Sequence, residues 1–342
     1  MNNMKFYRKL PIPLEVKRRF PITERMQQTK AARDVAISNI FAGSDNRLLL
    51  IIGPCSADDP DAVFEYLARL KCLSDKVNDK IFIIPRIYTS KPRTTGEGYK
   101  GMLHQPDPNM HPDMLQGIIS VRSLHMTALR DYDMSAADEM LYPENHRYLS
   151  DLLSYTVVGA RSVENQQHRL TASGLSIPVG MKNPVSGDIS VMLNAIRTSR
   201  HGHSFIYRGW EVESSGNMLT HGVLRGYKNS RGDVCNCDER HLLRTLDAFC
   251  EYGIEQPSVI VDVNHSNSGK DCFKQIDNAL NVIKLRRQDA LLKTFIKGLM
   301  IESYLEDGNM PVSGGVFGCS ITDPCLGWDK TERLVKTIAD ML

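Results

Sequence analysis

Short, almost continuous runs of apolar residues recur along this chain, and most of them are followed by a polar cluster and a helical repeat. Runs without alternation are typical of strands buried on both faces, as in parallel sheets. The sequence predicts eight such strands: Leu48–Gly53, Ile81–Tyr88, Ser135–Met140, Tyr155–Ala160, Ile177–Lys182, Ser204–Tyr207, Ser258–Val263 and Gly298–Ser303. Eight strand–helix units favour a (β/α)8 TIM barrel of the α/β class, although a doubly wound sheet has the same alternation.

The remaining segments suggest how the chain is organised. Residues 1–45 form an N-terminal extension, with a helix expected from Thr23 to about residue 41 that ends near Gly43. Residues 46–342 form the barrel. Asp59 and Pro60 are suited to begin the helix after the first strand. The polar, glycine-rich stretch from about 206 to 238 is predicted to be a hairpin-like insertion near the sixth strand.

Composition excludes several classes of protein. The 342 residues are 42% hydrophobic and 24% charged, which are ordinary globular proportions. No apolar run is long enough to span a membrane, and the first ten residues do not resemble a signal peptide. Eight cysteines are too few for a disulfide scaffold of this length. We therefore expect a reduced, cytoplasmic protein that does not insert into membranes.

Charge is unevenly distributed. The whole chain carries a net charge of +2, but residues 1–34 contain nine Lys/Arg against three Asp/Glu. Such a basic arm could touch nucleic acid or an anionic membrane. However, it lacks interleaved aromatic residues, and Pro11, Pro13 and Pro21 argue against an amphipathic helix. We expect no nucleic-acid partner and predict that the arm packs on a neighbouring subunit of a homodimer or homotetramer.

Reactive side chains gather where the predicted strands end. In (β/α)8 barrels the catalytic groups lie at the carboxyl ends of the strands. Four residues at or after these ends, Cys55, His265, Glu302 and Asp323, offer one thiolate, one imidazole and two carboxylates. This mixed set suits a divalent ion such as Mn, Fe, Co or Zn and leaves positions open for water or substrate. Each of these residues alone would be ordinary; together they predict a metal site.

A second group near the same rim is cationic. Buried like charges are costly unless an anion compensates them, and arginine matches phosphate or carboxylate oxygens in bidentate fashion. Six cations therefore predict a substrate, or two substrates, with several negative charges. These residues are Arg86, Lys91, Arg93, Arg161, Lys182 and Arg225.

Other candidate motifs carry less chemistry. Cys235-Asn236-Cys237 has no second cysteine pair at zinc-site spacing, so ordinary loop cysteines are favoured. Gly314-Gly315 and Gly96-Glu97-Gly98 do not match a phosphate-binding loop. Neither Ser56 nor Ser320 has a His–Asp pair that the sequence places beside it.

An ordered set of motifs resembles type I 3-deoxy-D-arabino-heptulosonate 7-phosphate (DAHP) synthase from about residue 35 to the C-terminus. The segments are IIGPCS, PRIYTSKPRTT, GARSVENQQHRLTASGLSIPVGMKN, GVLRGY, VDVNHSNSGK, IES and GCSITDPCLGW. The resemblance implies a metal-dependent transferase that joins phosphoenolpyruvate to D-erythrose 4-phosphate and releases phosphate, the first step of the shikimate pathway. It also implies an aromatic amino acid effector, although residues 142–147 and 205–217 differ from the better-known regulated members.

By the same resemblance, the site residues have assigned roles. Cys55, His265, Glu302 and Asp323 would hold the metal. Either this metal, or Lys91 acting as an acid, would polarise the aldehyde of the sugar. Arg93 and Thr94 would hold the sugar phosphate, while Glu139 would position a water. Phosphoenolpyruvate would bind Arg86, Lys91, Arg161, Lys182 and Arg225. Cys325 is close in sequence to Asp323, and we hypothesise that oxidation joins it to Cys55 and expels the metal.

Two rival functions share parts of this pattern. A related synthase uses arabinose 5-phosphate, but it usually has Ala-Asn-Arg-Ser after the lysine, where this chain has Pro92-Arg93-Thr94-Thr95. A non-catalytic barrel that senses an anionic metabolite should have lost ligands or cations, and none is missing here.

Overall fold

The computed structural model describes residues 3–342. Eight parallel strands form one sheet in the order β2-β1-β12-β11-β8-β5-β4-β3. A parallel bridge between Arg86 and Ala137 links the two outer strands, so the sheet closes into the predicted (β/α)8 barrel. The barrel strands are β1 (Leu48–Gly53), β2 (Ile81–Pro85), β3 (Ala137–Glu139), β4 (Tyr155–Val158), β5 (Val179–Lys182), β8 (Thr220–Leu224), β11 (Val259–Asp262) and β12 (Ile296–Glu302).

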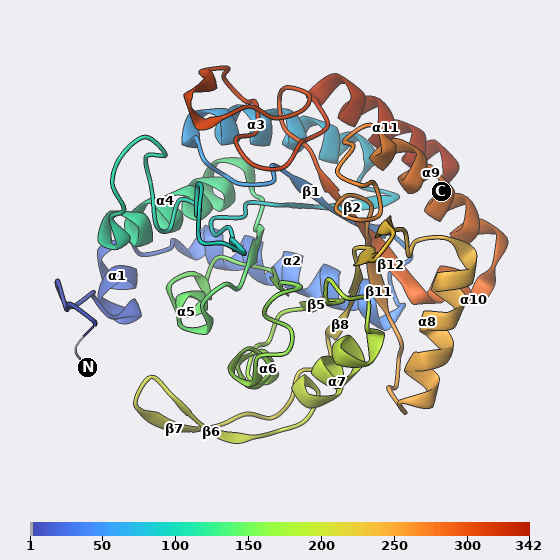
Figure 1. The fold of residues 1–342 in the computed structure, drawn as a ribbon, viewed down its shortest axis with the longest axis horizontal. Coiled ribbons are helices and arrows are strands. Elements are labelled where there is room, and N and C mark those ends of the chain that lie inside the picture. Colours follow the sequence, from blue (N-terminus) through green and yellow to red (C-terminus); the bar gives the residue numbers. More distant parts are fainter. Residues whose placement is uncertain (1–2) are drawn as a thin grey trace.

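Helices surround the barrel (Figure 1). Alternate strand residues that face outward pack against them in the larger apolar core, which includes Leu48, Leu50 and Ile52 of β1. The helices that follow the barrel strands are α3 (Pro60–Val77), α4 (Met114–Tyr132), α5 (His146–Leu149), α6 (Gln166–Ser173), α7 (Ile189–Ser199), α8 (Glu239–Glu251), α9 (Lys274–Gln288), α10 (Ala290–Phe295) and α11 (Trp328–Met341). Two short 3-10 turns are η1 (Pro143–Asn145) and η2 (Val312–Gly314).

The expected helix before the first strand is present as α2 (Glu24–Ala42). Thr23 accepts a hydrogen bond from the Met26 amide at its start, and Gly43 ends it with φ of 82°. Ile37, Ile40 and Phe41 of α2 join the inward-facing strand residues in a second apolar core. This helix therefore covers one end of the barrel and leaves the other end for chemistry.

The predicted sixth strand was wrong. Ser204–Tyr207 is β6, which pairs antiparallel with β7 (Trp210–Glu213) in a hairpin that extends away from the barrel (Figure 1). The sixth barrel strand is β8, which lies inside the stretch assigned to the insertion and is followed by a second hairpin of β9 (Tyr227–Asn229) and β10 (Gly232–Val234). This strand (THGVL) contains polar and small residues, so its composition did not indicate a strand although all of it is buried.

The N-terminal arm also departs from expectation. Pro13 does not prevent a helix but begins α1 (Pro13–Arg19), because proline is tolerated at the first helical position. Pro11 and Phe20 of the arm contact the same chain: the Tyr148 hydroxyl donates to the Pro11 carbonyl at 2.6 Å, and Arg122 donates to the Phe20 carbonyl. The expected contact with a neighbouring subunit stays a prediction. Within residues 3–342, no helix has the length and apolar character needed to cross a membrane.

Candidate active site

A polar cavity of about 290 Å³ opens at the carboxyl ends of the barrel strands. The predicted site residues converge there from many separate segments of the chain, and all except Glu302 line the wall. The residues in that wall are Cys55, Arg86, Lys91, Arg93, Thr94, Glu139, Arg161, Lys182, Arg225, His265 and Asp323.

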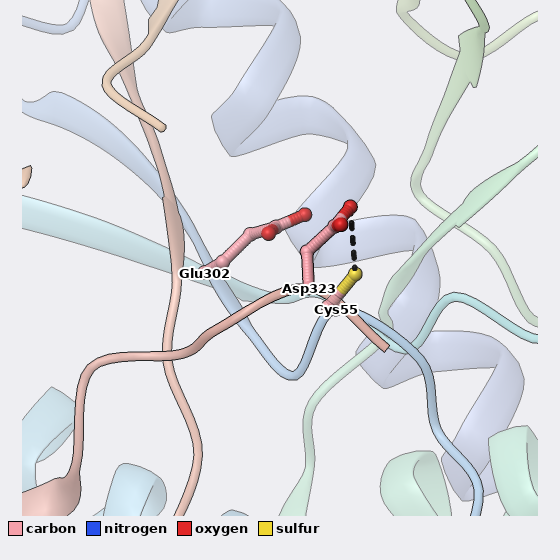
Figure 2. A group of neighbouring side chains, drawn as sticks. All are labelled: Cys55, Glu302 and Asp323. Carbon is pink, nitrogen blue, oxygen red and sulfur yellow. Dashed lines mark hydrogen bonds between the residues drawn. The ribbon is translucent and has the colours of Figure 1, made fainter. Parts of the chain in front are cut away.

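Three predicted metal ligands lie together on one side of this cavity. The Cys55 sulfur and carboxylate oxygens of Glu302 and Asp323 lie within 4.8 Å of one another (Figure 2). Cys55 follows β1 and Glu302 ends β12, and the two strands are paired with Gly53 opposite Glu302. Gly53 is required for this arrangement, because a Cβ there would lie 2.2 Å from the Arg86 carbonyl oxygen.

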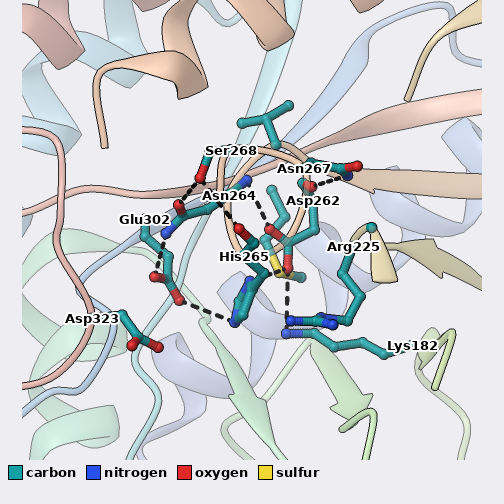
Figure 3. A network of polar contacts seen from close by, with 12 residues as sticks. Lys182, Arg225, Asp262, Asn264, His265, Asn267, Ser268, Glu302 and Asp323 are labelled. Atoms are coloured by element: carbon teal, nitrogen blue, oxygen red, sulfur yellow. Dashed lines mark hydrogen bonds and ion pairs between the residues drawn. The ribbon is translucent and has the colours of Figure 1, made fainter. Parts of the chain in front are cut away.

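His265 approaches the same cluster from the end of β11. Its Nε2 lies 3.7 Å from Glu302 Oε1, and its Nδ1 lies 2.9 Å from Asp262 Oδ2 (Figure 3). The backbone of His265 is left-handed, with φ of 51°, a conformation uncommon outside glycine. The contact between His265 and Asp262 is a close ion pair and not an aligned hydrogen bond, since within residues 3–342 neither His265 Nδ1 nor Asp262 Oδ2 has a hydrogen-bond partner. A carboxylate beside the far nitrogen of an imidazole helps to orient the ring toward a metal. The four donors fit a divalent ion with mixed sulfur, nitrogen and oxygen ligands.

Lys91 sits within this anionic cluster. Its Nζ lies 2.8 Å from Cys55 Sγ and 2.8 Å from Asp323 Oδ2. Burial alone would lower the pKa of Lys91, but Cys55 and Asp323 outweigh it and hold the pKa above its usual value. Burial would raise the pKa of Asp323, yet Lys91 and Lys270 keep it below its usual range. The lysine therefore stays charged beside the proposed metal ligands.

Glu302 is held by buried partners. Arg86 Nη2 donates to its Oε1 at 2.8 Å, and Asn264 Nδ2 donates to its Oε2 at 2.6 Å (Figure 3 shows the Asn264 contact). Burial opposes ionisation, but Arg86, followed by His265 and Lys91, lowers the pKa of Glu302. Both of its oxygens are fixed, so this carboxylate is oriented before any ligand arrives.

Buried cations line the cavity next to these ligands. Arg86 stacks over the Tyr88 ring at 3.8 Å from its centre, and Lys182 Nζ lies 5.9 Å from the same centre. Lys182 also lies 3.4 Å from Asp262 (Figure 3). Among residues 3–342, buried Arg86 Nε and Arg225 Nη1 find no hydrogen-bond partner. A buried guanidinium nitrogen without a partner is costly, which favours an anion between these two side chains.

The outer part of the cavity holds the remaining predicted residues. Arg161 Nε donates to Thr94 Oγ1 at 2.9 Å, and Arg93 Nε donates to the Tyr99 carbonyl at 2.8 Å. Glu139 ends β3 beside Gly159, where a Cβ would lie 2.4 Å from Glu139 Oε1. The absence of a side chain at residue 159 therefore leaves room for this carboxylate in the cavity.

The sequence analysis assigned no role to four contributors: Tyr88, Asp262, Asn264 and Lys270. Asp262 bridges His265 and Lys182, and Lys270 Nζ lies 2.7 Å from Asp323 Oδ1. The position of Asp262 as the last residue of a buried strand was a usable signal. Lys270 lies in an irregular loop, and nothing in its spacing pointed to Asp323.

Cys325 lies directly beside the cluster. Its sulfur accepts a hydrogen bond from the Cys55 amide at 3.3 Å, and both cysteines are free thiols in this structure. Their proximity agrees with the hypothesis of an oxidisable pair, which stays a prediction.

Known proteins resemble this chain over nearly its whole length. The Phe-sensitive phospho-2-dehydro-3-deoxyheptonate aldolase of Escherichia coli K12 is 37% identical, covering 96% of this chain and 93% of that protein. The phenylalanine-inhibited enzyme of Saccharomyces cerevisiae is 33% identical over 98% of this chain and 92% of its own length. A phospho-2-dehydro-3-deoxyheptonate aldolase structure from Francisella tularensis superposes with a TM-score of 0.91 at 30% identity, covering 99% and 98% of the two chains.

The family assignment agrees with these likenesses and with the geometry of the cavity. The sequence profile of the DAHP synthetase I family matches residues 19–336, a span that includes every residue of the candidate active site. Residues 19–336 make up most of the chain, so this protein belongs to the DAHP synthetase I family.

Proposed function

We propose that this enzyme condenses phosphoenolpyruvate with D-erythrose 4-phosphate and water to give 3-deoxy-D-arabino-heptulosonate 7-phosphate and phosphate. The reaction is the first step of the shikimate pathway to aromatic amino acids. One observation carries the proposal: buried cations and a cluster of metal-ligating side chains line the same cavity and lie in direct contact with one another. Relatives from bacteria and yeast carry the aldolase name that corresponds to this reaction.

Phosphoenolpyruvate would bind to the cations of this cavity. Its phosphate and carboxylate would pair with Arg86, Lys91, Arg161, Lys182 and Arg225. The unpaired nitrogens of Arg86 and Arg225 support this placement, since each can donate to an anionic oxygen. Arg93 and Thr94, at the outer part of the cavity, would hold the phosphate of the sugar.

Cys55, His265, Glu302 and Asp323 would hold a divalent ion of the Mn, Fe, Co or Zn type. Such an ion would supply Lewis acidity that polarises the aldehyde of the sugar. Asp262 would orient the His265 ring, and Asn264 and Arg86 would orient Glu302. These three partners make the ligands rigid, which is a condition for metal affinity.

The chain's own residues would then guide the bond changes. The C3 carbon of phosphoenolpyruvate attacks the aldehyde carbon, and Lys91 gives a proton to the aldehyde oxygen. Water positioned by Glu139 adds to C2, and phosphate leaves as its C–O bond breaks. Of the two protons of this water, one leaves with the phosphate and the other restores the charge of Lys91, so that C2 becomes a ketone. Holding both substrates between Arg93 and Arg225 converts a bimolecular encounter into a reaction at close range.

Phosphate release from phosphoenolpyruvate tests the proposal. Protein dialysed against a chelator should be inactive with erythrose 4-phosphate and should recover when Mn, Fe, Co or Zn is added. Asp323→Asn should lose bound metal and turnover, whereas Asp329→Asn, at an exposed position of α11, should keep both. Turnover with arabinose 5-phosphate but none with erythrose 4-phosphate, under any metal, would refute this function.

An aromatic amino acid effector belongs to the same proposal. Relatives include Phe-sensitive, Tyr-sensitive and Trp-sensitive enzymes. The two segments that differ from the better-known members touch here: the Tyr207 hydroxyl donates to the Pro143 carbonyl at 2.8 Å, and Arg147 lies over the Tyr207 ring. Adding Phe, Tyr and Trp in turn to the assay will identify the effector, and no response to any would show that this site has changed.

We also propose that the protein assembles as a homodimer or homotetramer and is located in the cytoplasm. Size-exclusion chromatography with light scattering, repeated after deletion of residues 1–9, tests whether the basic arm contributes to assembly.

A further inference from the structure

Two cysteines outside the candidate active site face each other in the loop between β10 and α8. The sulfurs of Cys235 and Cys237 lie 3.2 Å apart, and the Cys237 amide donates to the Cys235 sulfur at 3.4 Å. Cys237 is buried, while Cys235 is partly exposed. Solvent therefore reaches Cys235, whereas Cys237 lies in the protein interior next to it.

Asn236, between the two cysteines, ties together three loops of the cavity. Its Nδ2 donates to Asn183 Oδ1 at 3.2 Å, its Oδ1 accepts from the Gly226 amide at 2.7 Å, and its own amide donates to Asn267 Oδ1 at 2.8 Å. These loops follow β5, β8 and β11 and begin beside the site residues Lys182, Arg225 and His265.

The loops that contact Asn236 are closely packed at Gly226. Gly226 has φ of 69°, and a Cβ there would lie 2.5 Å from the Asn267 amide and 2.8 Å from the Val234 carbonyl oxygen. The strand that leads into the cysteine pair thus packs directly against the residue after Arg225. A displacement of Asn236 should therefore move the Gly226 and Asn267 loops as well, because both are hydrogen-bonded to it and packed closely against each other.

The two thiols differ in reactivity. The hydrogen bond from Cys237 outweighs burial and lowers the pKa of Cys235 to about 7. The same hydrogen bond, together with burial, raises the pKa of Cys237. Since the thiolate is the nucleophile, the more exposed Cys235 reacts first at neutral pH.

We propose that Cys235 and Cys237 are a modification site that forms a reversible disulfide by exchange with a low-molecular-weight disulfide such as oxidised glutathione. The Cys235 thiolate attacks one sulfur of that disulfide and releases a first thiolate. Cys237 then loses its proton, attacks Cys235 Sγ and releases a second one. In total, two protein thiols are oxidised and one small disulfide is reduced to two thiols.

Oxidation should weaken binding in the cavity. The sulfurs must move from 3.2 Å to a bond length of about 2.05 Å, which pulls on both sides of Asn236. The loop with Arg225 then shifts, so we expect the KM for phosphoenolpyruvate to rise about tenfold. This second effect rests on the proposed function, whereas disulfide formation does not.

To test this proposal, the full chain is loaded with metal and equilibrated in glutathione buffers that span a range of redox potentials. Acid quenching, alkylation and peptide mapping by mass spectrometry follow the loss of two hydrogens from the peptide that contains Cys235 and Cys237. Phosphoenolpyruvate KM is measured on the same samples, and reduction with dithiothreitol should restore it. Mapping also separates this pair from Cys55 and Cys325.

Matched variants assign the effect. Cys235→Ser and Cys237→Ser should abolish the redox-dependent change in KM, while Cys250→Ser, exposed on α8, should retain it. Asn236→Ala should raise KM in both redox states. Persistence of two free thiols in fully oxidising glutathione would refute the site, and a cross-link without a change in KM would refute its coupling to the cavity. Absence of turnover in the reduced protein would count against the proposed function alone.

Discussion

The ammonium group of Lys91 lies 2.8 Å from the sulfur of Cys55, within the cluster assigned to a metal. Burial and the nearby Glu302 raise the pKa of the Cys55 thiol, while the positive charge of Lys91 acts in the opposite direction. A charged lysine therefore helps Cys55 to reach the thiolate form that a metal ligand requires. The same side chain faces the cavity where the sugar aldehyde would bind.

Removing the positive charge of Lys91 should slow the reaction strongly. We expect Lys91→Met to lower kcat by about 10²-fold or more, the usual contribution of a positioned proton donor. Lys270→Met is the matched control, because Lys270 contacts the same carboxylate, Asp323, but is half exposed. Its kcat should change by less than about threefold, as for other exposed ion pairs. Steady-state kinetics with metal analysis of both variants checks this, and equal losses in the two would contradict a special role for Lys91.

The partner of His265 should control metal affinity. Asp262→Asn removes the carboxylate that lies 2.9 Å from His265 Nδ1, and metal affinity should fall about 10–100-fold. Asp238→Asn is a suitable control: Asp238 Oδ2 pairs with His241 Nδ1 at 2.7 Å on the surface of α8. Competition with a chromogenic chelator measures both affinities. An unchanged metal affinity in Asp262→Asn would exclude His265 as an oriented ligand.

Gly159 should be intolerant of a side chain. A Cβ would lie 2.4 Å from Glu139 Oε1, so Gly159→Ala must displace this carboxylate. We expect kcat/KM to fall at least about tenfold because the water position is lost. Gly174→Ala, whose nearest contacts would be an ordinary 3.6 Å, should be close to neutral. Circular dichroism must show both variants folded, and full activity of Gly159→Ala would remove Glu139 from the mechanism.

A buried histidine should make stability depend on pH. Burial lowers the pKa of His146 to about 4, whereas the histidine of an unfolded chain titrates near 6.5. Below pH 6.5 the unfolded chain takes up a proton that the folded protein does not, so stability falls from about pH 6.5 down to pH 4. His146→Leu should reduce this slope in urea unfolding, whereas His201→Gln, at an exposed residue, should not. Parallel slopes for both variants would argue against His146.

The chemistry of the site was accessible from the sequence because barrel strands are apolar runs and functional residues follow their ends. Cys55, Arg86, Lys182 and Glu302 were found in this way, and the structure places them together. This way of finding site residues fails where a strand is not apolar. β8 contains Thr220 and His221, and His221 hydrogen-bonds with the Tyr155 hydroxyl inside the barrel. Its burial is a property of the closed barrel, not of its composition.

Sequence by itself determined the alternation of strands and helices, the helix between Thr23 and Gly43, and the residue types of the site. Only the tertiary structure decided which strand is sixth, that Asp262 serves both His265 and Lys182, and that Lys270 reaches Asp323. It also showed that Asn236 and its flanking cysteines join three cavity loops. The physical reason is the distance along the chain over which each interaction acts. Hydrophobic periodicity and helix capping involve residues a few positions apart. The ion pairs and loop contacts of the site instead join distant segments, which only the closed barrel brings together.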